Sequence, residues 1–449
     1  MSQKVPIVAI VGRANVGKSS LFNAVLRRRE AIVADEAGTT RDSIMAKASW
    51  EQQDFWLVDT AGIKDPDDDF EFTIQEQILQ AADSADVIWV VIEADTVITE
   101  EDRRVAKLAL KTQKPVFLVV NKADKARKAV TADFQRLGIK PIFLSSATQN
   151  MGIEELLDQL IEVIPEASLV EADDRLRIAL LGRPNVGKSL LFNTLAKKQQ
   201  AIVADRAGTT RDINRSVVRY HSREVELLDT AGIRRSGKIA PGVEKFSVIR
   251  SLSAIEQADV CLVLLDVNEL ATQLDQKIIG MVKEAGKGLI VVVSKWDSLD
   301  EKTAYSRDQI AARLQSELVF VPWAPLIFTS SITGQNVAKI FELAGEIDER
   351  RHTVIKTREL NRWLEDVVAS HPPAGLKNRN PKLNYIVQET DNPNPSFKVF
   401  GAHTKFLHWS YKRYMERNMR ERWDYIGTPI KFWYIEKHET HKHGQKRTV

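Results

Sequence analysis

Two segments of this chain combine glycines with a lysine and a serine in a spacing that suits phosphate binding. They are Gly12–Ser19 (GRANVGKS) and Gly182–Ser189 (GRPNVGKS), and each follows an apolar run and precedes a helical pattern. In that context glycines let backbone N–H groups surround a phosphate, and the N-terminus of the next helix adds its positive dipole. A chance glycine-rich turn is the plain alternative, but finding the full context twice argues against it. The sequence therefore predicts two phosphate-binding loops.

The lysine and serine of each loop are the residue types that a magnesium-bound triphosphate requires. Lys18 and Lys188 would act in catalysis by reaching the β- and γ-phosphates. The hydroxyls of Ser19 and Ser189 would bind Mg²⁺. The loop residues that we expect to contact nucleotide are Gly12, Arg13, Ala14, Asn15, Val16, Gly17, Lys18 and Ser19, with Gly182, Arg183, Pro184, Asn185, Val186, Gly187, Lys188 and Ser189 in the second copy.

A repeated Asp-Thr-Ala-Gly-Ile segment follows a later apolar run in each copy. Asp59 and Asp229 would hold Mg²⁺ through water, and the amides of Gly62 and Gly232 would sense the γ-phosphate. The expected contacts of this segment are Asp59, Thr60, Ala61, Gly62 and Ile63, with Asp229, Thr230, Ala231, Gly232 and Ile233 in the second copy.

The choice of base is indicated by Asn121–Asp124 (NKAD), which follows the apolar run Val116–Val120. Asp124 can accept from the ring N–H and the amino group of guanine, whereas adenine would leave a buried carboxylate unpaired at a cost of ~1–3 kcal/mol or more. A backbone N–H near Ala147 would meet the guanine carbonyl. Taken alone NKAD could be an exposed loop, but its place favours a guanine site made of Asn121, Lys122, Ala123, Asp124, Ser146 and Ala147.

The second copy departs from this pattern. Ser294 stands where the first copy has Asn121, and Ser331 where it has Ala147. Because serine is shorter, we expect it not to span the same hydrogen bonds to the phosphate loop. Guanine preference should survive with weaker binding, through Ser294, Lys295, Trp296, Asp297, Ser330 and Ser331.

The GTTRD segments would supply a catalytic switch. Thr40 and Thr210 would give Mg²⁺ a hydroxyl when GTP is bound and lose it after hydrolysis; a polar turn is the bland alternative. Ile63 and Ile233 stand where some GTPases position water with a Gln. Intrinsic hydrolysis should therefore be slow until another group or ion assists.

The loops belong to an internal duplication. Three pairs of matching segments share one offset of 170 residues, and apolar runs such as Val87–Ile92 alternate with helical patterns. This predicts two α/β domains, each a parallel sheet with helices on both faces, at residues 1–165 and 175–350, joined by an acidic linker at 166–174. Residues 351–449 predict a small α+β domain with a basic tail at 438–449. Its expected elements are Thr357–Ser370, Leu383–Gln388, Phe397–Phe400, Trp409–Trp423 and Ile430–Ile435.

Composition limits the partners and the compartment. Residues 351–449 hold 19 Lys+Arg against 10 Asp+Glu, while the other 350 hold 45 against 51, so positive charge gathers where a polyanion would bind. No apolar run approaches the ~20 residues of a membrane helix. The single cysteine, Cys261, is most simply core packing, and a monomer in a reducing cytoplasm fits.

Together these residues resemble the Der (EngA) family of tandem ribosome-assembly GTPases over essentially the whole chain. The resemblance includes a long switch region at 230–260 and SYKRYMERNMRER…GTPIKFWY near the C-terminus. It implies GTP hydrolysis, a role in maturation of the large (50S) ribosomal subunit with its rRNA as partner, a KH-like third domain, and a potassium ion that Asn15 and Asn185 would bind during catalysis. Those asparagines could instead only brace the loop. Departures from the family are Ala14 for Pro, Ser294 for Asn and Ser331 for Ala.

The third domain lacks the GxxG loop of a standard RNA-binding KH domain. RNA contact would instead rest on charge, or the same helix face would simply be solvated. The candidate arginines are Arg413, Arg417, Arg420 and Arg422, and we expect Trp409, Tyr411, Tyr414 and Trp423 to be core.

Two rival functions remain beside a GTP-driven switch. A metabolic kinase would need an acceptor pocket with a catalytic base, and no such additional constellation is evident. A nucleotide-regulated adaptor, in which the second site binds but scarcely hydrolyses, is kept open by Ser294.

Overall fold

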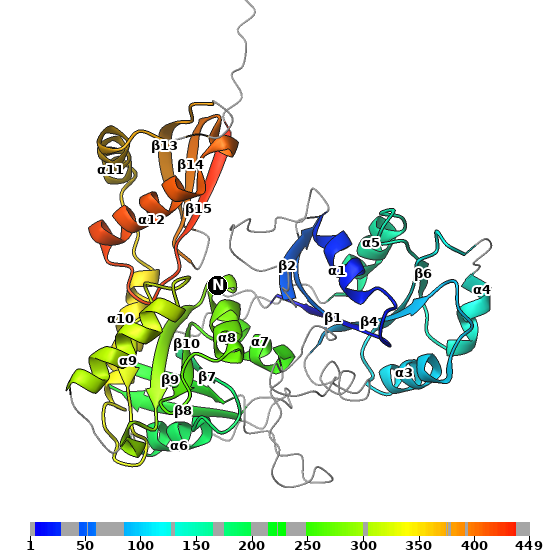
Figure 1. Ribbon diagram of the computed structural model, residues 1–449, viewed down its shortest axis with the longest axis horizontal. Coiled ribbons are helices and arrows are strands. Elements are labelled where there is room, and N and C mark those ends of the chain that lie inside the picture. The colour runs from blue at the N-terminus through cyan, green and yellow to red at the C-terminus, as the bar shows by residue number, and fades with distance from the viewer. Residues whose placement is uncertain are drawn as a thin grey trace, which may run out of the picture.

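The structure is a computed structural model, in which three bodies follow one another along the chain (Figure 1). The structure describes residues 5–27, 45–51, 53–59, 85–126, 131–164, 175–198, 214–221, 223–229, 248–299, 304–373, 375, 379–390 and 394–436. The expected linker at 166–174 and the expected tail at 438–449 lie outside these residues.

The first body contains a six-stranded sheet in the order β2-β3-β1-β4-β5-β6. All neighbours are parallel except β2 and β3, which pair antiparallel. The strands are β1 (Ile7–Val11), β2 (Met45–Trp50), β3 (Gln53–Asp59), β4 (Val87–Glu93), β5 (Val116–Asn121) and β6 (Ile142–Leu144).

The second body repeats this sheet strand for strand, in the order β12-β11-β10-β7-β9-β8, again with one antiparallel edge strand, β8. Its strands are β7 (Leu176–Leu181), β8 (Asn214–Tyr220), β9 (Arg223–Asp229), β10 (Val260–Asp266), β11 (Gly288–Ser294) and β12 (Leu326–Phe328). Cys261 in β10 is fully buried, and burial raises the pKa of its thiol to about 12, so it packs in the core as expected.

Helices cover both faces of each sheet, because successive strand residues face opposite ways. Along β1, Val8 and Ile10 belong to a core with α1 and α5, whereas Ile7 and Ala9 belong to the core that includes α3. The first body has α1 (Lys18–Leu26), α3 (Glu100–Leu110), α4 (Thr131–Phe134), the 3₁₀ turn η2 (Gln135–Leu137) and α5 (Ile153–Val163). The second has α6 (Lys188–Lys198), α7 (Val248–Gln257), α8 (Gln273–Glu284), η3 (Trp296–Ser298), α9 (Ala304–Glu317) and α10 (Lys339–Arg351).

The third body is a three-stranded sheet with two long helices. Strand β14 pairs antiparallel with β13 and parallel with β15. On α12, Tyr411, Met415 and Met419 recur every four residues and are buried, which seats the helix in the core shared with α11. The elements are α11 (Thr357–Ser370), β13 (Lys382–Glu389), β14 (Ser396–Ala402), η4 (Thr404–Phe406), α12 (Trp409–Trp423) and β15 (Lys431–Glu436).

The third body is attached to the second through backbone and side chains. The N–H of Leu289 donates to the Gly427 carbonyl at 2.8 Å, and the N–H of Gly427 donates to the Trp323 carbonyl at 2.9 Å. Arg351, buried at the end of α10, donates to Asn394 at 2.8 Å. Since Leu289 lies near the start of β11, this attachment is at the end of the second sheet opposite its carboxyl ends (Figure 1).

The first two bodies also touch directly. The indole N–H of Trp56 on β3 donates to a carboxylate oxygen of Glu256 on α7 at 2.6 Å, and both side chains are buried. In Figure 1, α7 lies on the side of the second body that faces the first. In the part of the chain that the structure covers, no helix is long and apolar enough to cross a membrane.

Candidate functional site

The sheet topology brings the expected nucleotide residues to one edge in each of the first two bodies. Strand β1 lies between β3 and β4, and β7 lies between β9 and β10. The chain leaves β1 toward one side of the sheet and β4 toward the other, which opens a crevice at their carboxyl ends. Both phosphate loops start there, directly after β1 and β7.

Each loop folds so that its lysine lies over its own backbone. The Lys18 ammonium donates to the carbonyls of Gly12 at 2.8 Å and Arg13 at 2.7 Å, and Lys188 donates to Arg183 at 2.7 Å. Asn15 and Asn185 adopt the left-handed conformation, with φ of 65° and 63°, which asparagine tolerates better than most residues. Both asparagine side chains are exposed at the loop surface.

The expected magnesium residues meet in the first body. The Ser19 hydroxyl donates to the Asp59 carboxylate at 2.5 Å, and Asp59 is buried. Asp229 is buried at the matching end of β9, and Ser189 is the second residue of α6. Hydroxyl and carboxylate oxygens suit Mg²⁺, which usually keeps waters and substrate phosphates as its other ligands. Among the described residues, no group of three His, Cys, Asp or Glu lies together so that it could hold a metal ion.

Asn121 ties three segments of the first site together. Its amide donates to the carbonyls of Val16 at 3.0 Å and Gly17 at 3.4 Å, and its carbonyl accepts from the Ala147 N–H at 3.1 Å. Lys122 adds a bond to the Asn15 carbonyl at 2.8 Å. The phosphate loop, the NKAD segment and the loop after β6 are therefore one connected unit.

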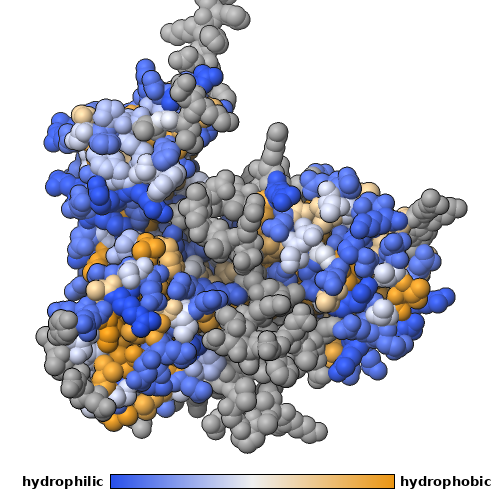
Figure 2. All heavy atoms as spheres, in the orientation of Figure 1, coloured by the Kyte–Doolittle hydropathy of each residue, from blue (hydrophilic) through white to orange (hydrophobic). Residues whose placement is uncertain are grey.

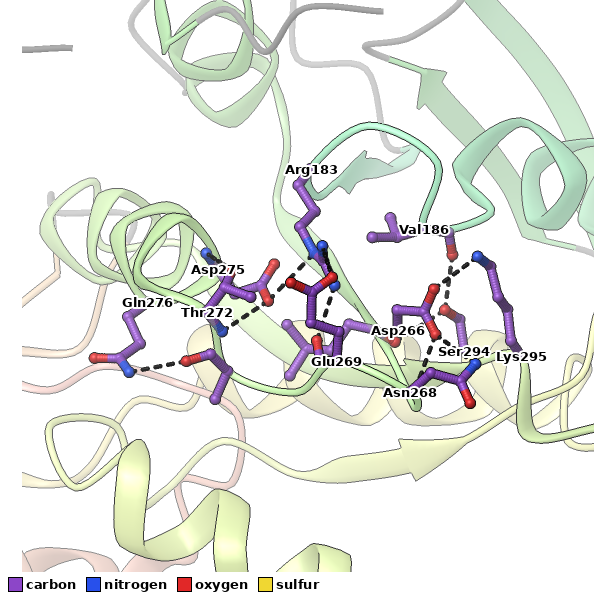
Figure 3. A network of polar contacts seen from close by, with 12 residues as sticks. Arg183, Val186, Asp266, Asn268, Glu269, Thr272, Asp275, Gln276, Ser294 and Lys295 are labelled. Atoms are coloured by element: carbon purple, nitrogen blue, oxygen red, sulfur yellow. Dashed lines mark hydrogen bonds and ion pairs between the residues drawn. The ribbon is translucent and has the colours of Figure 1, made fainter. Parts of the chain in front are cut away.

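In the second site, the expectation about Ser294 was partly wrong. Its hydroxyl does reach the phosphate loop, lying 2.7 Å from the Val186 carbonyl (Figure 3). The same hydroxyl lies 2.9 Å from the Leu265 carbonyl. The difference is the space that it leaves. A Cβ on Gly17 would lie 2.3 Å from the Asn121 amide nitrogen, whereas one on Gly187 would meet nothing within 4 Å.

The base-recognition residues differ from expectation in burial. Asp124 is exposed and Asp297 is half-buried. The Ser146 N–H donates to the Met151 carbonyl at 3.0 Å and the Ala147 N–H to Asn121, so a guanine carbonyl would share one of these donors. Trp296 stands in place of Ala123 and packs edge-on against Phe328. Ser330 is buried and Ser331 is half-buried beside them.

Charged residues behind the loops were missed in the sequence. Glu93, at the end of β4, accepts from Lys122 at 2.9 Å and lies 3.5 Å from Arg13. In the second body, Lys295 pairs with Asp266 at 2.6 Å, and Arg183 pairs with Glu269 (Figure 3). Burial alone would raise the pKa of Asp266, but bonds from Lys295 and Asn268 bring it below its usual value.

Several expected site residues lie outside the described residues. They are Thr40, Thr60, Ala61, Gly62, Ile63, Thr210, Thr230, Ala231, Gly232 and Ile233.

Two matching phosphate loops at the switch points of two matching parallel sheets, each with its base-recognition segment, define a tandem P-loop GTPase. Comparison with known proteins agrees. The family described as "50S ribosome-binding GTPase" matches residues 7–122 and 177–295, and "KH-domain-like of EngA bacterial GTPase enzymes, C-terminal" matches residues 355–434. The chain belongs to the GTPase Der (EngA) family, and it binds and hydrolyses GTP.

Relatives named GTPase Der align with nearly all of the chain. The protein from Gemmatimonas aurantiaca is 39% identical over 95% of this chain and 98% of its own length. Those from Agathobacter rectalis and Chloroflexus aggregans are 40% and 41% identical, over 97% and 95% of this chain and 99% and 96% of their own lengths.

Proposed function

We propose that this GTPase acts in biogenesis of the large (50S) ribosomal subunit, where it binds the subunit and its rRNA and cycles with GTP. The observation that carries the proposal is the joining of two nucleotide sites to a basic third domain on one chain. The family description "50S ribosome-binding GTPase" supports the same partner. We also propose that it works in the cytoplasm as a monomer.

The surface of α12 supports an RNA partner, although one of the four arginines expected to contact RNA does not face solvent. Arg413 and Arg417 are exposed, and Arg417 keeps 71% of its side chain in solvent. Arg420 is instead only 16% exposed and donates to Glu416 and to the carbonyls of Tyr425 and Thr428. The face of the third body seen in Figure 2 is largely hydrophilic, as a phosphate-binding surface would be.

The aromatic residues of this helix divide unevenly. Tyr411 is buried, and Tyr414 and Trp423 pack partly buried against the core, as expected. The expectation was wrong for Trp409, which is 50% exposed with the Arg413 guanidinium 4.7 Å from its ring centre. An exposed aromatic beside cations is a surface on which an unpaired base can stack.

Co-sedimentation with purified ribosomal subunits tests the proposal. We expect binding to the 50S subunit that differs between GDP and a non-hydrolysable GTP analogue and falls with increasing salt, because Lys and Arg contacts to phosphate release counterions. Binding that is absent in both nucleotide states would overturn the ribosomal role.

The residues of each site have distinct proposed tasks. Lys18 and Lys188 bind the β- and γ-phosphates, while Asp124 and Asp297 select guanine. Ser19 with Asp59, and Ser189 with Asp229, hold Mg²⁺, which neutralises phosphate charge when bound. Thr40 and Thr210 complete the metal site in the GTP state.

We propose that Asn15 and Asn185 bind K⁺. Their exposed side-chain oxygens lie in the phosphate loops, and Ile63 and Ile233 offer no side-chain group to orient water. Hydrolysis is expected to be faster in KCl than in NaCl at equal ionic strength, and equal rates would remove the ion from the proposal.

The adaptor hypothesis rests on the second site. Ser294 leaves open the space that Asn121 fills in the first site, so the second loop is less constrained. Lys18→Ala should leave only turnover by the second site, and Lys188→Ala only turnover by the first. If the protein is an adaptor, Lys18→Ala should lose nearly all GTP turnover but still bind GDP. If both sites hydrolyse GTP, each of the two variants should keep part of the turnover.

A further inference from the structure

An arginine of each phosphate loop reaches back to a buried aspartate. The Arg13 guanidinium lies 3.2 Å from the Asp102 carboxylate, and Arg183 lies 3.7 Å from Asp275. Asp102 is 2% exposed and Asp275 is 0% exposed. In both pairs the nearest nitrogen makes no aligned hydrogen bond, so the attraction is mainly between charges. We call each pair a loop anchor.

Each aspartate is held by the start of a helix. Asp102 is the third residue of α3 and Asp275 the third of α8, and each forms a capping box with a threonine. Asp102 accepts from the Thr99 backbone N–H at 2.9 Å, and Asp275 accepts from that of Thr272 at 3.1 Å. The loop anchors therefore connect each phosphate loop to a helix whose first turn is fixed.

The anchored arginine also holds the catalytic lysine in place. The Arg13 carbonyl accepts from Lys18 at 2.7 Å, and the Arg183 carbonyl accepts from Lys188 at 2.7 Å. The outer part of the Arg183 guanidinium pairs with Glu269, so the side chain is gripped on two sides (Figure 3). Fixing this side chain fixes the backbone carbonyl against which the lysine is oriented.

Recurrence in both bodies argues against a chance contact. Arg13 and Arg183 are 170 positions apart, whereas Asp102 and Asp275 are 173 apart. The pairing is thus kept although the second copy has gained three residues between loop and helix. A helix cap alone would not require an arginine from the loop.

We propose that Asp102 and Asp275 are positioning residues that hold the phosphate loops through Arg13 and Arg183, and so slow the release of nucleotide. The inference rests on the proposed nucleotide roles of the loops. Both aspartates lie outside the phosphate loops, buried in the first turns of α3 and α8. They act through the arginines on the position of the loop backbone, and so on the rate at which nucleotide dissociates.

The test at the first site uses the full chain carrying Lys188→Ala, so that fluorescent GDP reports on one loop. Asp102→Asn keeps an oxygen for the Thr99 cap but removes the charge that holds Arg13. We expect GDP to dissociate about tenfold faster, with KM for GTP rising more than kcat falls, since loop position governs binding geometry. Arg13→Lys keeps the positive charge, and its GDP dissociation rate should lie between those of the parent and of Asp102→Asn.

Thr99→Ala is the matched control, because it removes the hydroxyl that caps α3 and bonds Asp102 at 2.7 Å, but keeps the backbone N–H bond to Asp102 and the charge pair of Asp102 with Arg13. Its GDP dissociation should stay close to that of the parent. An unchanged rate in Asp102→Asn, or an equal acceleration by Thr99→Ala, would overturn the anchor. If the parent took up no guanine nucleotide, the nucleotide assignment itself would fail, and the two failures are thus distinguishable.

The second site offers an independent repeat. In the Lys18→Ala chain, Asp275→Asn is expected to accelerate GDP release about tenfold and Thr272→Ala to leave it unchanged. An effect at one site only would reject the anchor as a shared device of both loops.

Discussion

Positions 121 and 294 occupy matching ends of β5 and β11 but carry side chains of different reach. Asn121 binds two phosphate-loop carbonyls and the Ala147 amide, whereas Ser294 binds one loop carbonyl and Leu265. The direction of this difference could be predicted from the sequence. That serine still reaches Val186 could not, because it depends on how closely the loop approaches the strand.

Replacing Ser294 should therefore strengthen the second site. The space beside Gly187 can admit the amide of Ser294→Asn, and one or two added hydrogen bonds should tighten GDP about tenfold. Isothermal titration in the Lys18→Ala chain measures this affinity. Asn121→Ser in the Lys188→Ala chain is the matched opposite and should weaken GDP; unchanged affinity in both would show that these bonds do not control binding.

Asp275 adds a pH-dependent contribution to stability. Burial raises its pKa to about 6, against the attraction of Arg183 and with repulsion from Glu269. The folded state therefore binds the Asp275 proton more tightly than the unfolded state does. The stability that this proton contributes is fully present below the ordinary pKa near 4 and is lost as pH rises through about 6. The unfolding free energy of Asp275→Asn should rise by about 3 kcal/mol relative to that of the parent between pH 4 and pH 7.5, because only the parent loses this contribution. Calorimetric unfolding of the full chain at both pH values measures it, and a pH-independent difference would contradict the shift.

At the scale of elements, helix α12 separates residues that look alike in the sequence. Arg420 is half-buried against Trp323 of the second body, 5.2 Å from its ring centre, while Arg413 is exposed. Burial lowers the pKa of the Arg420 guanidinium, yet Glu416 keeps it paired. Which arginines face outward depends on what the helix packs against, and no local pattern encodes that.

Substitutions on this helix should divide accordingly. Arg420→Ala removes a half-buried, hydrogen-bonded charge and should cost about 2 kcal/mol of unfolding free energy, while Arg413→Ala should cost less than about 0.5 kcal/mol. Thermal unfolding compares them.

For RNA, Arg413→Glu with Arg417→Glu should weaken 50S binding and flatten its salt dependence; an unchanged salt slope would remove α12 from the interface.

The strands and loops that form the sites could be predicted because continuous apolar runs mark buried parallel strands. The edge strands β2 and β8 were missed, since Met45–Trp50 and Asn214–Tyr220 mix polar and apolar residues. Asp102 and Asp275 did have a local signal, a threonine three residues earlier in each copy. Their partnership with Arg13 and Arg183 could not be read, because it joins segments some ninety residues apart.

At the scale of the whole molecule, Trp56 and Glu256 connect the two GTPase domains. Glu256 lies on α7, and β3, which carries Trp56, ends at Asp59 of the first site. Trp56→Phe keeps the ring but leaves a buried carboxylate without that donor, and should cost about 1–3 kcal/mol. Small-angle scattering should also show the two domains separating.

Trp89→Phe is the control for this change. Trp89 is equally buried in the same sheet, but among the described residues its indole N–H has no hydrogen-bond partner. The substitution removes indole volume, as Trp56→Phe also does, but it breaks no hydrogen bond, so it should cost less than Trp56→Phe. Equal effects of the two substitutions would mean that the bond to Glu256 contributes nothing to domain contact.

The attachment of the third body at the amino end of β11 has a practical consequence for dissecting the protein. A cut at residue 350, where the composition changes, would fall one residue before the end of α10 and remove Arg351. It would also strip Leu289 of the carbonyl that its N–H now meets and uncover Ile347, which packs beneath Gly427. Anyone wishing to study the second GTPase domain in isolation should therefore express it fused to everything that follows, through residue 436 at least.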